Sequence, residues 1–151
     1  MIKIRVPATT ANLGPGFDVL GMALGMHNTF SFEKDDTAAP DERNMVYRAY
    51  KYTFQSLGRE PIPVRITIDA EIPISRGLGS SAACIAAGIM GANAMMEHPL
   101  DRDDVLKLAT QIEGHPDNVA PAIFGGLMIS VMDEAGIVYN RLVLDDGLRF
   151  I

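Results

Sequence analysis

A loop rich in glycine and serine stands directly before a run of small and apolar residues. The loop reads Pro73-Ile74-Ser75-Arg76-Gly77-Leu78-Gly79-Ser80-Ser81-Ala82-Ala83, and the run from Ala82 to Met96 predicts a helix. The first N–H groups of a helix lack partners within it, and the helix dipole adds partial positive charge there. The two glycines allow close backbone approach, and the two serines offer hydroxyls. The sequence therefore predicts an anion site, with a nucleotide phosphate as its ligand.

Composition limits the kinds of partner that this chain can have. Its 151 residues are 48% hydrophobic, which is enough to build one domain with a real core. The net charge of −6 argues against a nucleic-acid backbone as the main partner. The single cysteine, Cys84, excludes an internal disulfide and is interpreted as a packing residue of a protein in a reducing cytoplasm. No leader peptide and no membrane span are predicted.

Apolar periodicity predicts a mixture of strands and helices. Strands are predicted over residues 2–6, 28–33, 64–70, 126–132 and 137–144. Helices are predicted over residues 43–57 and 82–96, and from Asp101, where Asp104 stands in a capping-box position. Residues 7–18, with two glycines and two prolines, are expected to be irregular. The hairpin-like connections favour an α+β fold over a parallel doubly wound sheet.

The glycine-serine loop is compatible with more than one known phosphate site. The Walker-type P-loop requires a lysine after its last glycine, and none follows Gly79. From Gly77 onward the letters fit the dinucleotide pattern G-x-G-x-x-A, but that motif turns straight off its strand, whereas this loop begins well after the strand at 64–70. The acidic residues about twenty positions on, Glu97 and Asp101, do not follow a second strand. An ordinary Gly-Ser turn before a helix remains the plainest alternative.

Two other segments decide between these alternatives. Asn12 to Asp18 and Glu113 to Asn118 gather carboxylates and amides in loops punctuated by glycine and proline. Together with the segment Pro73 to Ala83, they resemble the three motifs of the GHMP kinases, the superfamily of galactokinase, homoserine kinase, mevalonate kinase and phosphomevalonate kinase. Within it, Pro7 to Asp18 and Glu113 to Ala122 are similar to the homoserine-phosphorylating branch. The resemblance implies an α+β fold like that of ribosomal protein S5 domain 2.

That resemblance also implies a reaction, in which the γ-phosphoryl group of ATP moves to the γ-hydroxyl of L-homoserine on the way to threonine. Mg²⁺ is the implied metal, held by Ser80 and Glu113. For Glu113 the alternative is a solvated carboxylate at a helix C-terminus, which the negative end of the dipole disfavours. The implied ATP-binding residues are Asn44, Pro73, Ile74, Ser75, Arg76, Gly77, Leu78, Gly79, Ser80, Ser81, Ala82 and Ala83. Asn44 serves equally well as the N-cap of the helix that follows it.

Substrate contacts are implied for Asn12, Asp18 and His115, which offer an acceptor and mixed donors to an amino acid that carries an alcohol. Asn12 as a turn cap and Asp18 as a cap of an adjacent element are the plainer alternatives. Asn118 and Asp18 are the implied catalytic residues. Asn118 stands where mevalonate kinase and galactokinase relatives have an aspartate, and an asparagine cannot accept the hydroxyl proton. We therefore expect the hydroxyl to attack directly, with Asp18 orienting it.

The resemblance further implies that residues 1–151 form an N-terminal ATP-binding domain, and that a C-terminal ferredoxin-like domain is absent from this chain. That second domain supplies arginines to the homoserine carboxylate in the family, so we expect this chain to bind nucleotide with little or no turnover. Residues 144–151 are expected to lead into that domain and to leave an apolar surface that favours a homodimer. A mevalonate kinase-like enzyme, an RNA-binding S5-like module and an NAD-dependent oxidoreductase are the alternatives, although the lack of basic clusters disfavours RNA.

Overall fold

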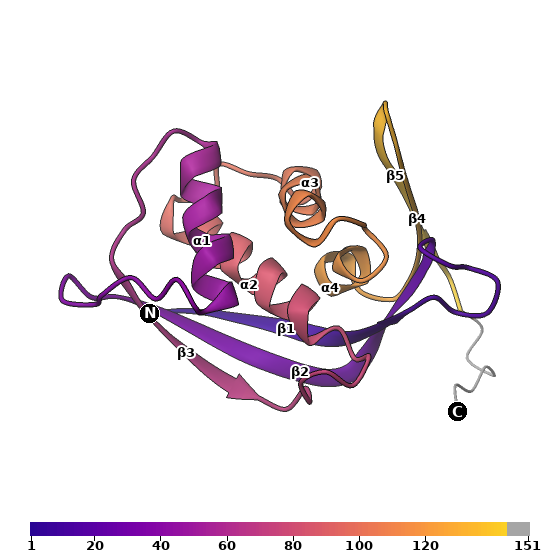
Figure 1. Cartoon of the computed structure of the whole chain (residues 1–151), viewed down its shortest axis with the longest axis horizontal. Coiled ribbons are helices and arrows are strands. Elements are labelled where there is room, and N and C mark those ends of the chain that lie inside the picture. The colour runs from indigo at the N-terminus through magenta and orange to yellow at the C-terminus, as the bar shows by residue number, and fades with distance from the viewer. Residues whose placement is uncertain (145–151) are drawn as a thin grey trace.

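The computed structural model describes residues 1–144, in which strands and helices alternate irregularly along the chain (Figure 1). The α+β class predicted from the sequence is confirmed. Residues 145–151, which belong to the segment expected to lead into a second domain, lie outside the described residues. The elements in chain order are β1 (Ile2–Ala11), β2 (Leu20–Lys34), α1 (Met45–Ser56), β3 (Val64–Ala70), α2 (Ser80–Met95), α3 (Arg102–Glu113), α4 (Val119–Phe124), β4 (Leu127–Asp133) and β5 (Gly136–Leu142).

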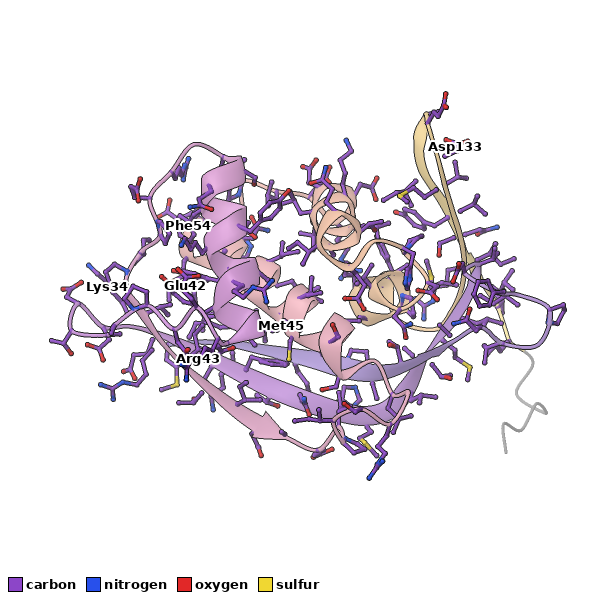
Figure 2. All side chains as sticks on the ribbon, viewed as in Figure 1. Lys34, Glu42, Arg43, Met45, Phe54 and Asp133 are labelled. Atoms are coloured by element: carbon purple, nitrogen blue, oxygen red, sulfur yellow. The ribbon has the colours of Figure 1, made fainter. Side chains whose placement is uncertain are left out.

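The long strand β2 organises the sheet, because it pairs antiparallel with three other strands. β1 runs along one side of it, β3 pairs with its second half from Asn28 to Lys34, and β4 pairs with its first residues from Leu20 to Met22. β4 and β5 form a hairpin, and Asp133 at its tip accepts hydrogen bonds from the backbone N–H groups of Ala135 and Gly136 (Figure 2). Figure 1 shows the helices over one face of β1–β3, with the hairpin rising at the far end. This arrangement is a two-layer α+β sandwich.

The core lies between the sheet and helix α2, which is apolar on every side. Such a helix is expected to be buried, and ten of its sixteen residues are. The aromatic residues Phe30 and Phe32 of β2 and Tyr50 and Phe54 of α1 are almost fully buried around it. The rings of Phe32 and Tyr50 stack with centroids 6.0 Å apart, and the hydroxyl of Tyr50 donates to the carbonyl oxygen of Ile62 over 3.0 Å. None of the helices in residues 1–144 is both long and apolar enough to cross a bilayer.

Side-chain caps mark where α1 and α3 begin. The side chain of Asn44 accepts a hydrogen bond from the N–H of Val46 over 2.9 Å, so the N-cap alternative for Asn44 is confirmed. Asp101 and Asp104 form the predicted capping box at the start of α3. Gly114 ends that helix in the left-handed conformation, which leaves Glu113 as its last residue.

Two predictions about secondary structure were wrong, and one short helix was missed. Residues 7–11 belong to β1, because Pro7 sits in a strand that pairs only with β2 and a missing N–H is tolerated at such an edge. β2 begins at Leu20 rather than at residue 28, since β1 and β4 supply partners to a stretch with no apolar alternation. The short helix α4 was not predicted from the sequence. It contains Pro121, which is tolerated because it stands in the first turn, where no N–H is needed.

Candidate active site

The segment between β3 and α2 is an exposed loop that ends at the start of the most buried helix. The side chains from Pro73 to Gly77 are exposed, and those from Leu78 to Ser81 are partly buried. Ser75, Gly77 and Gly79 all have positive φ, so the chain turns sharply before it enters α2. Gly79 occupies the N-cap and gives no side-chain acceptor to the first turn. The N–H groups there are therefore available to an anion.

Strand β1 passes so close to this loop that Gly79 must be a glycine. A Cβ at Gly79 would lie 1.9 Å from the Oγ1 of Thr9, and its φ of 64° already disfavours a side chain. The backbone N–H of Thr9 also donates to the carbonyl oxygen of Leu78 over 3.2 Å. The loop is thus anchored to the sheet at its last turn.

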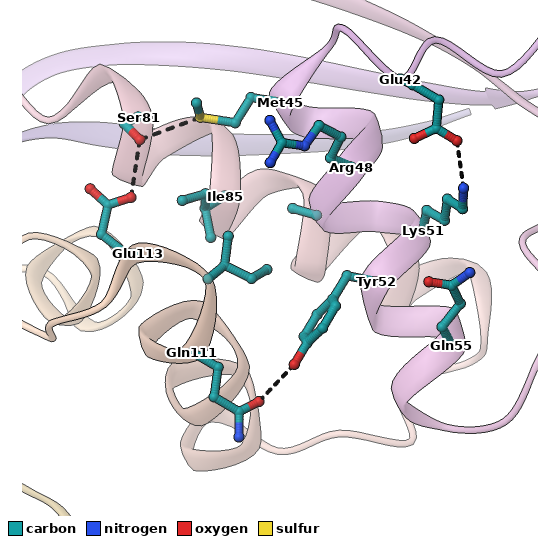
Figure 3. Close-up of a pocket in the computed structure, with 12 residues that line it drawn as sticks. Glu42, Met45, Arg48, Lys51, Tyr52, Gln55, Ser81, Ile85, Gln111 and Glu113 are labelled. Atoms are coloured by element: carbon teal, nitrogen blue, oxygen red, sulfur yellow. Dashed lines mark hydrogen bonds and ion pairs between the residues drawn. The ribbon is translucent and has the colours of Figure 1, made fainter.

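The first turn of α2 meets the end of α3 through a hydroxyl and a carboxylate. The Oγ of Ser81 donates to Oε2 of Glu113 over 3.0 Å, and it also lies 3.3 Å from the sulfur of Met45 (Figure 3). The sequence analysis predicted that Ser80 and Glu113 hold Mg²⁺ together, whereas in the structure the hydroxyl that contacts Glu113 is that of Ser81. Neighbouring residues on a helix project about 100° apart, so residue type alone could not choose between the two serines.

A cavity of about 520 Å³ opens beside this pair, between α1 and α3 (Figure 3). Arg48 and Tyr52 line it from α1, and Gln111 lines it from α3. The hydroxyl of Tyr52 donates to Oε1 of Gln111 over 3.1 Å and so links the two helices. Sequence reasoning did not single out Arg48 or Tyr52. Their only signal was a spacing of four residues, which places both on one face of a helix.

Asn12 and Asp18 lie at the two ends of the turn that joins β1 to β2. The backbone N–H of Asp18 donates to Oδ1 of Asn12 over 2.9 Å, and both residues have positive φ. This contact supports the interpretation of Asn12 as a turn cap. The Asp18 carboxylate is exposed and takes no part in that bond, so it remains available to a ligand.

His115 and Asp117 form a close pair on the loop between α3 and α4. Nδ1 of His115 donates to Oδ1 of Asp117 over 2.5 Å; the Asp117 side chain is fully buried, while that of His115 is 47% exposed. The hydrogen bond to Asp117 raises the pKa of His115 above its usual value, against the opposing effect of partial burial. The negative charges of Asp117, Asp18 and Glu113 raise it further. The exposed face of the ring therefore offers a hydrogen-bond donor to a ligand once the imidazole is protonated, and these contacts favour that protonated form.

The structure brings Asp18 and His115 together, as a common substrate site requires. A carboxylate oxygen of Asp18, a ring nitrogen of His115 and a carboxylate oxygen of Asp117 all lie within 4.8 Å of one another. The loop that carries the last two packs directly on β2, where a Cβ at Gly21 would lie 1.7 Å from the carbonyl oxygen of Asp117. Oδ2 of Asp117 is buried without a partner among residues 1–144. Sequence reasoning did not assign Asp117 a role.

Asn118 follows this pair and stands at the N-cap of α4. Its backbone N–H donates to Oδ1 of Asp117 over 2.8 Å, and its side-chain oxygen accepts a hydrogen bond from Thr9 over 2.8 Å. The three sequence motifs therefore converge, because Thr9 contacts both the glycine-serine loop and Asn118. The side-chain oxygen of Asn44, in contrast, is occupied at the start of α1.

Comparison with known proteins agrees with this convergence. Residues 44–126, more than half of the chain, match the family profile described as the GHMP kinases N terminal domain. A homoserine kinase from Clostridium botulinum (strain ATCC 19397 / Type A) is 42% identical over 99% of this chain and 54% of its own length. The homoserine kinase of Clostridium botulinum strain Eklund 17B is 43% identical over the whole chain and 54% of its own length. The chain thus spans about half the length of the curated relatives it matches.

Solved structures lead to the same family. A Listeria monocytogenes protein assigned as a homoserine kinase superposes with a TM-score of 0.84 and 38% identity, over 95% of this chain and 55% of the other. The mevalonate kinase of Methanococcus jannaschii shares the fold with a TM-score of 0.73, at 18% identity, over 94% of this chain and 56% of the other. The motifs, the fold and the family profile therefore agree, and the chain belongs to the GHMP kinases.

Proposed function

We propose that this chain forms the nucleotide-binding part of an enzyme that phosphorylates the γ-hydroxyl of L-homoserine with ATP and supplies O-phosphohomoserine for threonine synthesis. The observation that carries the proposal is the contact between Ser81 and Glu113 at the N-terminus of α2, near the cluster of Asp18, His115 and Asp117. Relatives that are 42% identical along almost the whole chain are homoserine kinases, which supports the choice of substrate.

The ATP phosphates would lie on the loop from Ser75 to Ser81 and on the free N–H groups of α2. Mg²⁺ suits the residues beside them, because Ser81 and Glu113 offer a hydroxyl and a carboxylate, the hard oxygen ligands that this ion prefers. Ser81 replaces the predicted ligand Ser80, since its hydroxyl is the one that contacts Glu113. When bound, the ion would neutralise charge on the phosphates.

Homoserine would lie over Asp18 and His115. The exposed Asp18 carboxylate suits its ammonium group, and His115, whose ring is oriented by Asp117, offers a hydrogen-bond donor to an oxygen of the substrate. Asn12 contributes by fixing the turn that presents Asp18. Asn118 cannot take the hydroxyl proton, so the protein contributes by positioning the hydroxyl for direct attack.

In the two-domain arrangement that we propose, residues 1–151 are the N-terminal ATP-binding domain. A ferredoxin-like domain would complete the site with arginines that make a charge-assisted contact to the homoserine carboxylate. We place the activity in the cytoplasm, where ATP and free amino acids are available. On this proposal the chain alone binds nucleotide, with little or no turnover.

A coupled ADP-release assay tests the proposal on this chain and on the full-length protein. Homoserine and mevalonate are compared as acceptors at equal concentration, with ATP and Mg²⁺ present. We expect ADP release with homoserine from the full-length protein, at a kcat/KM at least about a hundredfold above that for mevalonate, because mevalonate lacks the ammonium group that Asp18 would bind. Equal rates with both acceptors, or turnover with mevalonate alone, would contradict the assignment.

A further inference from the structure

Thr9 is a polar residue in a completely buried position, at an irregularity of the sheet. Along β1, Pro7 pairs with His27 and Thr9 pairs with Ala23, so β1 advances two residues while β2 goes back four. Ala8 and Thr9 are both fully buried, which breaks the alternation seen from Ile2 to Val6. Irregularities of this kind re-aim side chains next to functional sites. The buried hydroxyl that results requires a partner.

That partner is the Asn118 amide, while the backbone of Thr9 holds the glycine-serine loop. Oγ1 donates to Oδ1 of Asn118 over 2.8 Å. The backbone N–H of the same residue donates to the carbonyl oxygen of Leu78 over 3.2 Å, and its side chain fills the space where a Cβ of Gly79 would lie. One residue of β1 therefore contacts both segments that surround the proposed phosphoryl-transfer site.

The surroundings of the Asn118 amide fix which way it faces. Its nitrogen lies 3.5 Å from Oδ1 of Asp117, a carboxylate oxygen that can only accept. Turning the amide over would set its carbonyl oxygen against that carboxylate, which is repulsive. The oxygen is therefore on the Thr9 side, and the NH₂ group is on the side of Asp117 and His115.

We propose that Thr9 is a positioning residue, whose hydroxyl holds the Asn118 amide with its NH₂ group toward the substrate. Asn118 then acts as a hydrogen-bond donor to the reacting oxygen or the transferring phosphoryl group. This inference rests on the proposed function and assigns an orientation to one of its residues. It also separates two roles of Thr9, since the loop is held by the backbone and the amide by the hydroxyl.

That separation makes the experiment selective. Thr9→Val removes the hydroxyl and keeps both the β-branched shape and the backbone N–H. In the protein that shows turnover in the assay above, we expect kcat to fall about tenfold while KM for ATP changes less than about threefold, because the loop anchor is unaltered. Thr9→Ser should restore kcat to within about threefold, since it restores the donor. Thr10→Val, on the same strand, is the matched control and should leave kcat unchanged.

A second measurement does not depend on turnover. In ¹⁵N-labelled protein, the side-chain amide of Asn118 should be as immobile as its backbone in wild type and in Thr9→Ser, and it should become mobile in Thr9→Val. If Thr9→Val does not fold, Thr9→Cys replaces it and is compared with Thr9→Ser, because that pair differs only in a weak thiol donor against a hydroxyl.

The inference would be overturned by a mobile Asn118 amide in the wild type, or by a kcat of Thr9→Val within about twofold of wild type. A fall in kcat that Thr9→Ser shares equally would also overturn it, because loss of shape would then be the cause. Failure of the proposed function is a different result. In that case homoserine is not phosphorylated at all, while the immobile amide and its dependence on Thr9 are still observed.

Discussion

The hydroxyl of Ser81 donates to the carboxylate of Glu113 over 3.0 Å and so joins the first turn of α2 to the last residue of α3. A carboxylate at the C-terminus of its own helix is unfavourable, because the helix dipole is negative there. The N-terminus of α2 next to it has the opposite polarity. The N-terminus of α2 therefore stabilises the Glu113 carboxylate. A cation placed between Ser81 and Glu113 would be bound by both side chains.

Replacing Glu113 with Gln is expected to raise the Mg²⁺ requirement. The variant keeps the size and one oxygen of the side chain but loses the charge that favours a divalent cation. The Mg²⁺ concentration for half-maximal ATP binding should rise about tenfold or more, as measured by calorimetric titration at fixed ATP. Glu134→Gln, at the tip of the β4–β5 hairpin, is the control for loss of one negative charge. An unchanged Mg²⁺ requirement in Glu113→Gln would remove Glu113 as a ligand.

Asp18→Asn is expected to lower turnover without lowering stability. The turn is held by the backbone N–H of Asp18, which bonds to Asn12, so the side chain can change while the backbone stays in place. Loss of the carboxylate removes the acceptor for the substrate ammonium. KM for homoserine should rise and kcat should fall, so that kcat/KM falls about tenfold. Asp36→Asn, in an exposed loop, controls for net charge. Full kcat in Asp18→Asn would remove this residue from the mechanism.

Much of the fold could be predicted because local signals and tertiary structure agree in these places. The strand at 64–70 alternates strictly, and the capping box at Asp101 marks the start of α3 unambiguously. The first half of β2 could not be predicted, because its sequence shows no alternation of apolar and polar residues. It is a strand because it pairs with β1 and β4. A strand stabilised only by long-range pairing leaves little trace in its sequence.

The site divides in the same way. The glycine-serine loop and the segment from Glu113 to Asn118 carry unusual residue patterns and could be found by inspection. The choice of Ser81 over Ser80 depends on where α3 ends relative to α2, which no local pattern records. Thr9 and Asp117 were missed because their residue types are common at any position. Thr9 matters through its contact with Asn118, which is distant in sequence, and Asp117 matters because it is buried beside His115 in a tight loop.

Asp117→Asn should lower the pKa of His115 toward its ordinary value of about 6.5. The hydrogen bond to the Asp117 carboxylate is the main cause of the raised pKa of His115. An asparagine at position 117 has no negative charge, so it removes both the charge-assisted hydrogen bond and the Coulombic attraction. Titration of the imidazole carbon-bound protons by NMR measures the change. A pKa of His115 that does not move would show that Asp18 and Glu113 hold the charge instead.

Stability should follow the same titration. Because the folded pKa of His115 is raised, its contribution is fully present below the unfolded pKa near 6.5 and is lost as pH rises through the folded value. The wild-type protein should therefore lose part of its free energy of unfolding across that window, and Asp117→Asn should lose less. Urea unfolding below and above the window measures both slopes. His115→Gln, which has no titrating ring, should remove this dependence altogether.

Asp101→Ala should destabilise the protein by about 1 kcal/mol, since it removes a side-chain cap from the start of α3. For a chain of this length, that loss corresponds to a fall in Tm of about 2–4 °C. Asp36→Ala removes a similar charge, whose only ion pair within residues 1–144 is a long one at the surface, and it should change Tm very little. Equal shifts in the two variants would mean that net charge, rather than the cap, is responsible.

Gly77 and Gly79 are required to be glycine for different reasons, backbone conformation at Gly77 and both conformation and lack of space at Gly79. Both have positive φ, but a Cβ at Gly79 would lie 1.9 Å from Oγ1 of Thr9, whereas a Cβ at Gly77 would meet nothing within 4 Å. Gly77→Ala should therefore cost about 1 kcal/mol of unfolding free energy through backbone strain alone. Gly79→Ala carries the same strain and must also push β1 from the loop, so it should cost more and should weaken ATP binding as well. Urea unfolding and calorimetric titration with Mg²⁺-ATP measure the two effects. Equal losses for the two variants would mean that the close approach of Thr9 does not constrain the loop.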